Sequence, residues 1–327
     1  MPRRRITFSR NVFLPLTTVC RNRCLYCGFR RPMGDGCLMS PAEVEAILER
    51  GARSGCTEAL FTFGERPEEV PGFGAHLDAL GESSILEYCR RLCLLAIEKG
   101  LLPHTNAGVL EEEELRMLAE VNASMGLMLE TTARVFAHEG SPGKVPELRI
   151  GTIEAAGRLR IPFTTGLLLG IGETWEDRRR SLETIAELHR RYGHIQEVIL
   201  QNFTPQAGTG MASATMISTD EYCNTIRLAR ELLPADIAIQ IPPNLADIAR
   251  LVPCGVDDLG GVSPCSIDHI NPEHPWPAID ELRQMVGDAE LVERLCIYPQ
   301  FIERGWYSPT IAPLVRRLTA RLKEQYL

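Results

Sequence analysis

The chain has 327 residues, of which 44% are hydrophobic and 24% are charged, and its formal net charge is -8. This composition is typical of a folded globular protein and argues against a disordered or low-complexity chain. The acidic balance argues against a nucleic-acid duplex or an anionic membrane as the main partner, because both carry negative charge. The longest apolar runs are strand-sized and fall short of the roughly 20 residues of a membrane helix, so we expect a cytoplasmic protein.

The same order of elements recurs along the chain: a short β-branched or leucine-rich run, a turn, and an amphipathic helix. This order predicts parallel strands joined by helices, and eight such runs fit a complete (β/α)8 TIM-type barrel. We expect one barrel domain over residues 1–327, with a C-terminal helical closing segment at 309–327. The predicted strands are residues 12–18, 58–63, 102–107, 124–130, 163–169, 197–203, 238–242 and 258–263.

Two helix starts and one helical stripe can be read directly from the chain. Ser40-Pro41-Ala42-Glu43 is a capping box with proline at the first helical position, and the run from Ser218 to Glu221 repeats that logic. In residues 85–96 apolar side chains recur at helical spacing, and Cys89 and Cys93 belong to that stripe. We therefore expect these two cysteines to pack in the core.

Three cysteines, Cys20, Cys24 and Cys27, lie close together directly after the first predicted strand. In a barrel that loop lies at the C-terminal ends of the strands, where barrel enzymes hold their chemistry. Crowded thiols differ from the spread of a disulfide framework and indicate a metal. Iron-sulfur clusters are held by thiolates, and three ligands leave one of four irons open. The alternative is a structural zinc site, which needs a distant fourth ligand such as Cys37.

The pattern Cys20-x3-Cys24-x-Tyr26-Cys27 resembles the signature loop of the radical S-adenosylmethionine (SAM) superfamily. The resemblance implies that the three cysteines hold a 4Fe-4S cluster whose open iron is chelated by the amino and carboxylate groups of SAM. It implies that an electron from the cluster, replenished by an external reductant, cleaves SAM to methionine and a 5′-deoxyadenosyl radical. By the same resemblance, Tyr26 packs beside the adenine.

Two further segments are similar to SAM-binding segments of that superfamily. Thr62-Phe63-Gly64-Glu65 is similar to its Gly-Gly-Glu loop, whose backbone binds the methionyl ammonium, although Phe63 replaces the first glycine. Residues 166–173 resemble its glycine-rich fifth strand, where Gly170 lets the backbone approach the adenine. The resemblance thus makes Thr62, Gly64, Glu65 and Gly170 cofactor-binding candidates.

Two charged residues are candidates for the polar groups of SAM. Glu130 ends the fourth predicted strand and resembles a polar contact of the superfamily to SAM; the alternative is an exposed carboxylate at a helix start. Arg149 can pair with the SAM carboxylate through its planar fork, or it is a surface arginine of a helix.

Polar residues with no role in a generic SAM site also end predicted strands or begin the next loops. Amides, hydroxyls and one histidine at a barrel mouth can hydrogen-bond a uracil ring and a ribityl chain, although each residue alone also fits a turn or a cap. The candidate substrate contacts are Thr164, Gln201, Asn202, Gln240, Asn244, Ser263, Asp268 and His269.

Together with the cysteine loop, these segments resemble the CofG-type family of deazaflavin synthases from Ile6 to about Gly305. The resemblance implies conversion of 5-amino-5-(4-hydroxybenzyl)-6-(D-ribitylimino)-5,6-dihydrouracil to 7,8-didemethyl-8-hydroxy-5-deazariboflavin. Ammonia leaves in this step, as in a carbon-nitrogen lyase, and a CofH-type radical SAM subunit supplies the substrate as partner or product donor. Asp257-Asp258-Leu259 departs from the family pattern, which has an aromatic residue beside the glycines.

Two other functions stay open on the sequence. Another barrel-type radical SAM enzyme, of the biotin synthase or hydrogenase-maturase group, would share the cysteine loop and the glycine-rich strand. A non-catalytic iron-sulfur or zinc-binding module would need only the cysteines. The wide separation of Cys254, Cys265 and Cys296 argues against an auxiliary cluster.

Overall fold

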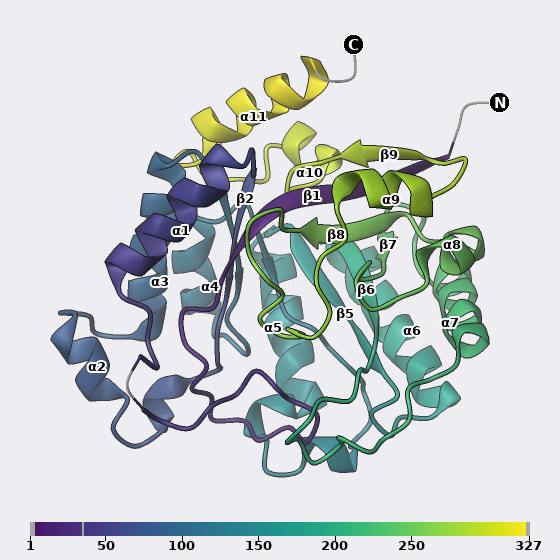
Figure 1. The fold of residues 1–327 in the computed structure, drawn as a ribbon, viewed down its shortest axis with the longest axis horizontal. Coiled ribbons are helices and arrows are strands. Elements are labelled where there is room, and N and C mark those ends of the chain that lie inside the picture. The colour runs from purple at the N-terminus through teal and green to yellow at the C-terminus, as the bar shows by residue number, and fades with distance from the viewer. Residues whose placement is uncertain (1–3, 35, 325–327) are drawn as a thin grey trace.

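The computed structural model describes residues 4–34 and 36–324. Eight strands pair in parallel in chain order, and the first pairs with both the second and the eighth, which closes the ring. The predicted (β/α)8 barrel is therefore confirmed (Figure 1). The strands are β1 (Arg5–Leu14), β2 (Glu58–Thr62), β3 (Leu102–Asn106), β4 (Ser124–Gly126), β5 (Phe163–Leu169), β6 (Ile195–Asn202), β7 (Ala238–Gln240) and β8 (Asp258–Val262).

The first strand differs most from its predicted bounds. It was expected over residues 12–18, but β1 begins at Arg5 and ends at Leu14. Ile6 and Phe8 are buried and make the early part of the strand a core element. Pro15 has no amide hydrogen for a further ladder bond, so the strand stops before it. The earlier end leaves a longer loop to carry the cysteines.

A ninth strand, β9 (Glu290–Glu293), was not predicted. It pairs with residues 5–8 of β1, whereas β2 pairs with residues 11–14. The run Glu-Leu-Val-Glu has two apolar residues between charges, too few for a strand pattern. Its pairing with β1, distant in sequence, is a tertiary effect.

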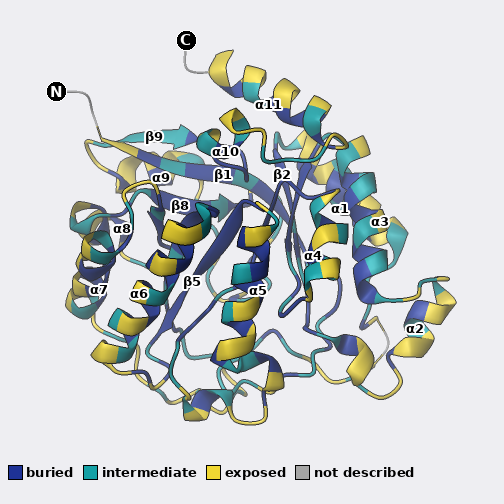
Figure 2. Ribbon diagram, turned by 180° about the vertical axis from the view of Figure 1, so that it is seen from behind, coloured by how far each residue is buried: buried dark blue, intermediate teal, exposed yellow. Residues whose placement is uncertain are grey.

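Helices cover the outside of the barrel and turn their buried faces toward it (Figure 2). The cap at Ser40 with Glu43 is confirmed, as is the cap of Ser218 on the Glu221 amide. Cys89 and Cys93 are fully buried, as predicted. The crossover helices are α1 (Pro41–Arg53), α2 (Gly74–Ala79), α3 (Ile85–Glu98), α4 (Glu112–Ala119), α5 (Pro146–Arg158), α6 (Trp175–Tyr192), α7 (Thr219–Leu232), α8 (Ile248–Leu251) and α9 (Ile279–Met285).

The end of the chain lies across the end of the barrel opposite the cysteine loop (Figure 1). The carbonyl oxygen of Cys296 accepts hydrogen bonds from the side chains of Gln196 at 2.8 Å and Ser124 at 2.9 Å. These bonds hold residues 294–298 across the starts of β4 and β6. Two helices follow, α10 (Pro299–Glu303) and α11 (Ala312–Glu324), and residues 325–327 of the predicted closing helix lie outside the described residues.

Two cysteines, Cys223 and Cys254, form a disulfide that the sequence analysis did not anticipate. The other nine cysteines are free. Because Cys254 is in the disulfide and the Cys296 thiol is buried against the Leu102 carbonyl, neither is placed for an auxiliary cluster. In residues 4–34 and 36–324, no helix combines the length and apolar character needed to cross a membrane.

Candidate active site

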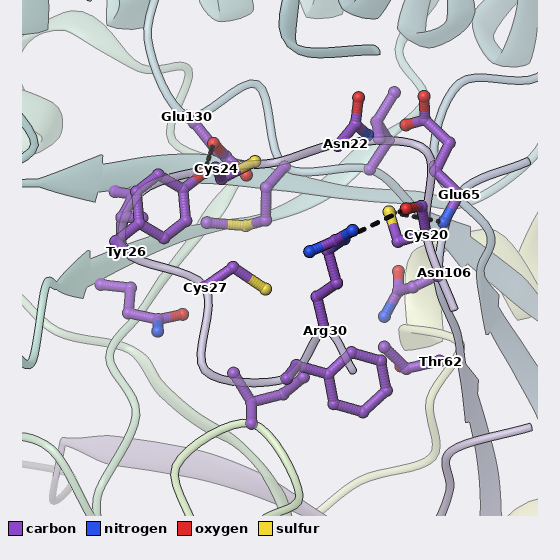
Figure 3. Close-up of a pocket in the computed structure, with 18 of the residues that line it drawn as sticks. Cys20, Asn22, Cys24, Tyr26, Cys27, Arg30, Thr62, Glu65, Asn106 and Glu130 are labelled. Carbon is purple, nitrogen blue, oxygen red and sulfur yellow. Dashed lines mark hydrogen bonds between the residues drawn. The ribbon is translucent and has the colours of Figure 1, made fainter. Parts of the chain in front are cut away.

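A cavity of about 370 Å³ lies at the C-terminal ends of the strands, and the cysteine loop forms part of its wall. Cys20, Cys24 and Cys27 all line it, and all three are free thiols. Figure 3 shows the three sulfur atoms around one common space. The structure therefore brings the predicted cluster ligands together.

The zinc alternative lacks its predicted fourth ligand in this site. Within the described part of the chain, no group of three His, Cys, Asp or Glu side chains is placed to hold one metal ion. Zinc draws its ligands to one point, whereas a cubane spreads its thiolates over several iron atoms. Cys37, the fourth ligand of the zinc alternative, is 8% exposed, packs in the hydrophobic core and does not line the cavity.

The loop after β2 holds the cysteine loop in place through its backbone. The Gly64 amide donates to the Thr17 carbonyl at 2.9 Å, and the Glu65 amide donates to the Cys20 sulfur at 3.2 Å. Burial raises the pKa of the Cys20 thiol, and it does the same for Cys24. The thiolate forms therefore depend on positive charge brought to the sulfur, which iron provides.

Gly64→Ala is expected to displace the cysteine loop. A Cβ at Gly64 would lie 1.9 Å from the Val19 carbonyl oxygen and 2.8 Å from the Cys20 Cβ. Such overlap with backbone costs about 1–3 kcal/mol of unfolding free energy, and we expect the bound iron per chain to fall with it. Denaturant unfolding and iron analysis measure the two effects.

Gly34→Ala is the matched control, since a Cβ there meets no heavy atom of the described residues within 4 Å. Its unfolding free energy should stay within about 0.5 kcal/mol of the wild type. Equal iron contents in the two variants would show that close approach at Gly64 does not position the loop.

Glu65 lines the cavity, but its carboxylate is bound by protein groups. Arg21 donates to Oε1 at 2.9 Å, and the Val109 amide donates to Oε2 at 3.1 Å. The side chain therefore ties the cysteine loop to the loop after β3. Thr62 and Gly64 line the same cavity, so the predicted SAM-binding segment after β2 faces the thiols.

Glu130 follows β4 with a φ of 66°, and its buried carboxylate collects polar partners from three segments. The Tyr26 hydroxyl and the Lys144 ammonium donate to it, and His138 Nε2 lies 2.9 Å from Oε2. Burial alone would raise the pKa of Glu130, but Lys144, Arg149 and His138 hold the pKa well below its ordinary value. Glu130 is thus an ionised, buried group of the cavity wall, and the exposed-carboxylate alternative is wrong.

Arg149, on α5, is 3% exposed, so it is not a surface arginine. It donates to the carbonyl oxygens of Met128 at 2.6 Å and Gly143 at 2.8 Å. Its guanidinium lies 3.8 Å from the Glu65 carboxylate and 3.6 Å from the Glu130 carboxylate. With Arg30 and Lys144 it makes three cations against two carboxylates in the cavity wall, a balance that suits an anionic group of a ligand.

A second cavity, of about 180 Å³, extends from the first into the barrel interior. Thr164 and Gln201 line both cavities, while Gln240 and Asp268 line the second alone. The two cavities share part of their wall, made by Phe13, Leu60, Asn106, Thr164, Ile199, Gln201, Ile270 and Asn271. A ligand in the inner cavity therefore borders one in the outer cavity.

Five predicted site residues line neither cavity: Gly170, Asn202, Asn244, Ser263 and His269. The Gly170 amide donates to Glu173, and the Asn202 amide donates to the Ile217 carbonyl. Asn244 donates to Asp268, Ser263 pairs with Ser266, and the His269 ring lies 5.4 Å from the Phe13 ring. Their roles in SAM or substrate binding stay predictions.

The cavities also contain polar residues that the sequence analysis did not single out. Asn106 ends β3, so the rule that polar residues at strand ends face the mouth would have found it. Lys144 lies on a single 3-10 turn, η3 (Pro142–Lys144), which has no periodic signal. The inner cavity adds Ser9 and Asn11 within β1, Glu58 at the start of β2, His104 within β3, Glu197 near the start of β6 and Arg294 directly after β9.

The comparisons with known proteins agree with this site. Residues 14–185 match the model of the radical SAM superfamily. The 7,8-didemethyl-8-hydroxy-5-deazariboflavin synthase of Methanoculleus marisnigri is 65% identical over 322 residues, which cover 98% of this chain and 97% of that protein. The chain belongs to the radical SAM superfamily and to its deazariboflavin synthase family. The synthase of Archaeoglobus fulgidus is 51% identical over 316 residues, covering 95% of this chain and 96% of that protein.

Solved structures of other superfamily members share the fold. HydG, a maturase of the [FeFe]-hydrogenase, superposes with a TM-score of 0.72 over 95% of this chain and 69% of its own, at 14% identity. Methylornithine synthase gives a TM-score of 0.60 over 93% of this chain and 83% of its own, at 16% identity. As a member of the radical SAM superfamily, the chain uses a 4Fe-4S cluster and SAM.

Proposed function

We propose that the chain converts 5-amino-5-(4-hydroxybenzyl)-6-(D-ribitylimino)-5,6-dihydrouracil to 7,8-didemethyl-8-hydroxy-5-deazariboflavin. Ammonia is released, and SAM is consumed to 5′-deoxyadenosine and methionine. The observation that carries the proposal is the pair of joined cavities, one lined by three free thiols and the other by amides, hydroxyls and carboxylates. Proteins named as this synthase are 62% and 65% identical to the chain over 98% of its length, and this similarity supports the same reaction.

In this proposal the outer cavity takes the cluster and SAM. Cys20, Cys24 and Cys27 hold the cluster, which supplies the electron that breaks a carbon-sulfur bond of SAM. The cationic groups of Lys144 and Arg149, which line the same cavity, attract the SAM carboxylate. Tyr26, held by its bond to Glu130, gives the adenine an aromatic wall.

The inner cavity takes the uracil and the ribityl chain, which present many donors and acceptors. Thr164 and Gln201 lie in the shared wall, so they contact both cavities and can fix the reacting carbon beside SAM. Gln240 and Asp268 line the inner part and bind polar edges of the substrate. The whole chain acts as one barrel domain, and a CofH-type radical SAM subunit makes the substrate.

The test is product formation by the anaerobically reconstituted protein. With the dihydrouracil adduct, SAM and a chemical reductant, we expect fluorescent deazaflavin, 5′-deoxyadenosine and ammonia in equal amounts, measured by chromatography with mass detection. Omitting the adduct is the control and should abolish deazaflavin formation.

Other outcomes would support the alternative functions. SAM cleavage without deazaflavin would indicate a different radical SAM reaction. A brown protein that never cleaves SAM would indicate a non-catalytic iron-sulfur module, and a colourless protein with one zinc would indicate a zinc module.

A further inference from the structure

The inner cavity contains a buried carboxylate that the proposed roles have not used. Glu58 is the first residue of β2, its side chain is directed into the barrel, and it is 5% exposed. The Ser9 hydroxyl, on the neighbouring strand β1, donates to Glu58 Oε2 at 2.5 Å. A carboxyl in such a place contacts whatever occupies the inner cavity.

Glu58 differs from Glu197 and Asp258, the two other carboxylates at the end of the barrel opposite the cysteine loop. Arg294 donates to Asp258 at 2.6 Å and to Glu197 at 2.8 Å. These two carboxylates neutralise the positive charge of the Arg294 guanidinium. Among residues 4–34 and 36–324, no cation lies within ion-pairing distance of the Glu58 carboxylate. Glu58 is therefore free to change its protonation state without breaking a salt bridge.

The surroundings of Glu58 shift the pKa of its carboxyl group toward neutral pH. Burial raises the pKa of Glu58 to about 7; Ser9 and Arg294 oppose the increase, while Glu197 and Asp258 add to it. His104 lines the same cavity, and burial lowers its pKa to about 4, so it is neutral near pH 7. Another titratable residue of this cavity, Cys296, is protonated because burial raises its pKa well above the ordinary value. Glu58 thus titrates where a group that both gives and takes protons is most effective.

The wall near Glu58 also has unsatisfied hydrogen-bonding groups. Asn11 and Trp276 line the inner cavity, and the structure's described residues offer no hydrogen-bond partner to Asn11 Oδ1 or Trp276 Nε1. Asn11 is 1% exposed. A buried acceptor and a buried donor without partners are costly unless a ligand pairs with them. The inner cavity is thus built to receive a polar molecule next to Glu58.

We propose that Glu58 carries the proton in the ammonia-releasing step, giving it to the leaving amino nitrogen and taking one back from the neighbouring carbon. The proposal rests on the proposed function. In this elimination a carbon-nitrogen and a carbon-hydrogen bond break on adjacent carbons, and a carbon-carbon double bond forms between them. The nitrogen leaves with its bonding electron pair and the Glu58 proton, as ammonia. The carboxylate then accepts the carbon-bound proton, so Glu58 returns to its starting state and no oxidant is needed.

Glu58→Gln tests this step, because glutamine keeps the shape but cannot transfer the proton. We expect adduct-dependent 5′-deoxyadenosine formation to persist, while deazaflavin and ammonia formation fall together by about 10²- to 10⁴-fold. A species heavier than the product by one ammonia should accumulate in single-turnover samples analysed by mass spectrometry. Glu290→Gln, at the first residue of β9 and outside both cavities, is the control and should behave as wild type.

Ser9→Ala provides a readout that a purely structural role would not move. Because the Ser9 hydrogen bond lowers the pKa of Glu58, its removal raises that pKa. Deazaflavin formation by the wild type should decline as the pH rises through about 7, and this limb should move to higher pH in Ser9→Ala. If Glu58→Gln does not fold, the shift of this limb alone decides, and an unmoved limb refutes the proposal.

The outcomes separate this inference from the function on which it rests. If the wild type makes no deazaflavin from the adduct, both proposals fall. If the wild type makes it and Glu58→Gln makes it equally fast, only the role of Glu58 is wrong. Equal loss of 5′-deoxyadenosine and deazaflavin in Glu58→Gln would also overturn the role, since Glu58 would then act before the elimination.

Discussion

Cys24→Ala is expected to abolish cluster binding and SAM cleavage together. Cys24 lines the outer cavity between Cys20 and Cys27, and two remaining thiolates cannot hold a cubane with one open iron. Anaerobically reconstituted wild type should contain about four iron atoms and as much acid-labile sulfide per chain, whereas the variant should contain close to none. 5′-Deoxyadenosine should fall to the level of a protein-free reaction.

Cys37→Ala is the matched control, since Cys37 is also a free cysteine near the loop but is packed in the core. It should keep the iron, the sulfide and the SAM cleavage of the wild type. Full iron content in Cys24→Ala would contradict the ligand set, and loss of one tightly bound zinc in Cys37→Ala would revive the zinc site.

Arg294→Met is expected to be the most destabilising single change at the end of the barrel opposite the cysteine loop. Arg294 pairs with Glu197 and Asp258, all three side chains are buried, and its guanidinium lies 4.3 Å above the Tyr298 ring. Methionine fills similar space but leaves two buried carboxylates without a cation. Breaking such a buried pair costs about 3–5 kcal/mol of unfolding free energy, measurable by denaturant unfolding at pH 7.

The loss should shrink at lower pH, because protonation removes the unpaired charges. The direction follows from the pKa of Glu197, which burial already raises and which Arg294 lowers. Without Arg294 that pKa rises further above its unfolded value, so the variant gains stability as pH falls toward the unfolded pKa. Arg5→Met, which removes an exposed pair with Glu290, is the control and should cost at most about 1 kcal/mol. A similar small cost for Arg294→Met would show that the buried network contributes little.

Much of the barrel could be predicted from the sequence because its strands are local signals. Residues 163–169 contain β-branched, aromatic and leucine residues between Pro162 and Gly170, and β5 has those bounds. The cysteine loop was equally legible, since its spacing is short and its place after a strand sets its position in the barrel. Glu130 and Arg149 were found as candidates, but their burial, which decides between the alternatives, depends on contacts between distant segments.

The inner cavity was harder to predict, for a physical reason. Glu58 and Asp258 begin their strands, and Glu197 lies near the start of β6. Strand starts lie at the end of the barrel opposite the active site. From the sequence alone, a charged residue at a strand start is expected to be exposed to solvent. Their burial follows from the segment after β9, which covers that end and pairs Arg294 with Glu197 and Asp258. Conversely, Asn202 and Asn244 end up bonded to neighbouring loops, and no pattern in the chain distinguishes an amide that faces a ligand from one that braces a turn.

Residues 294–298 cover the end of the barrel opposite the cysteine loop, and this covering has a chemical consequence. Carbon radicals take hydrogen from almost any nearby donor, so a barrel open at both ends would expose them to bulk solvent and small solutes. The segment that covers this end of the barrel, residues 294–298, is far in sequence from the cysteines of the cavity. A chain ending after Asp288 would keep the three cavity thiols of Cys20, Cys24 and Cys27 and still lack this covering segment, and we expect it to cleave SAM without making product.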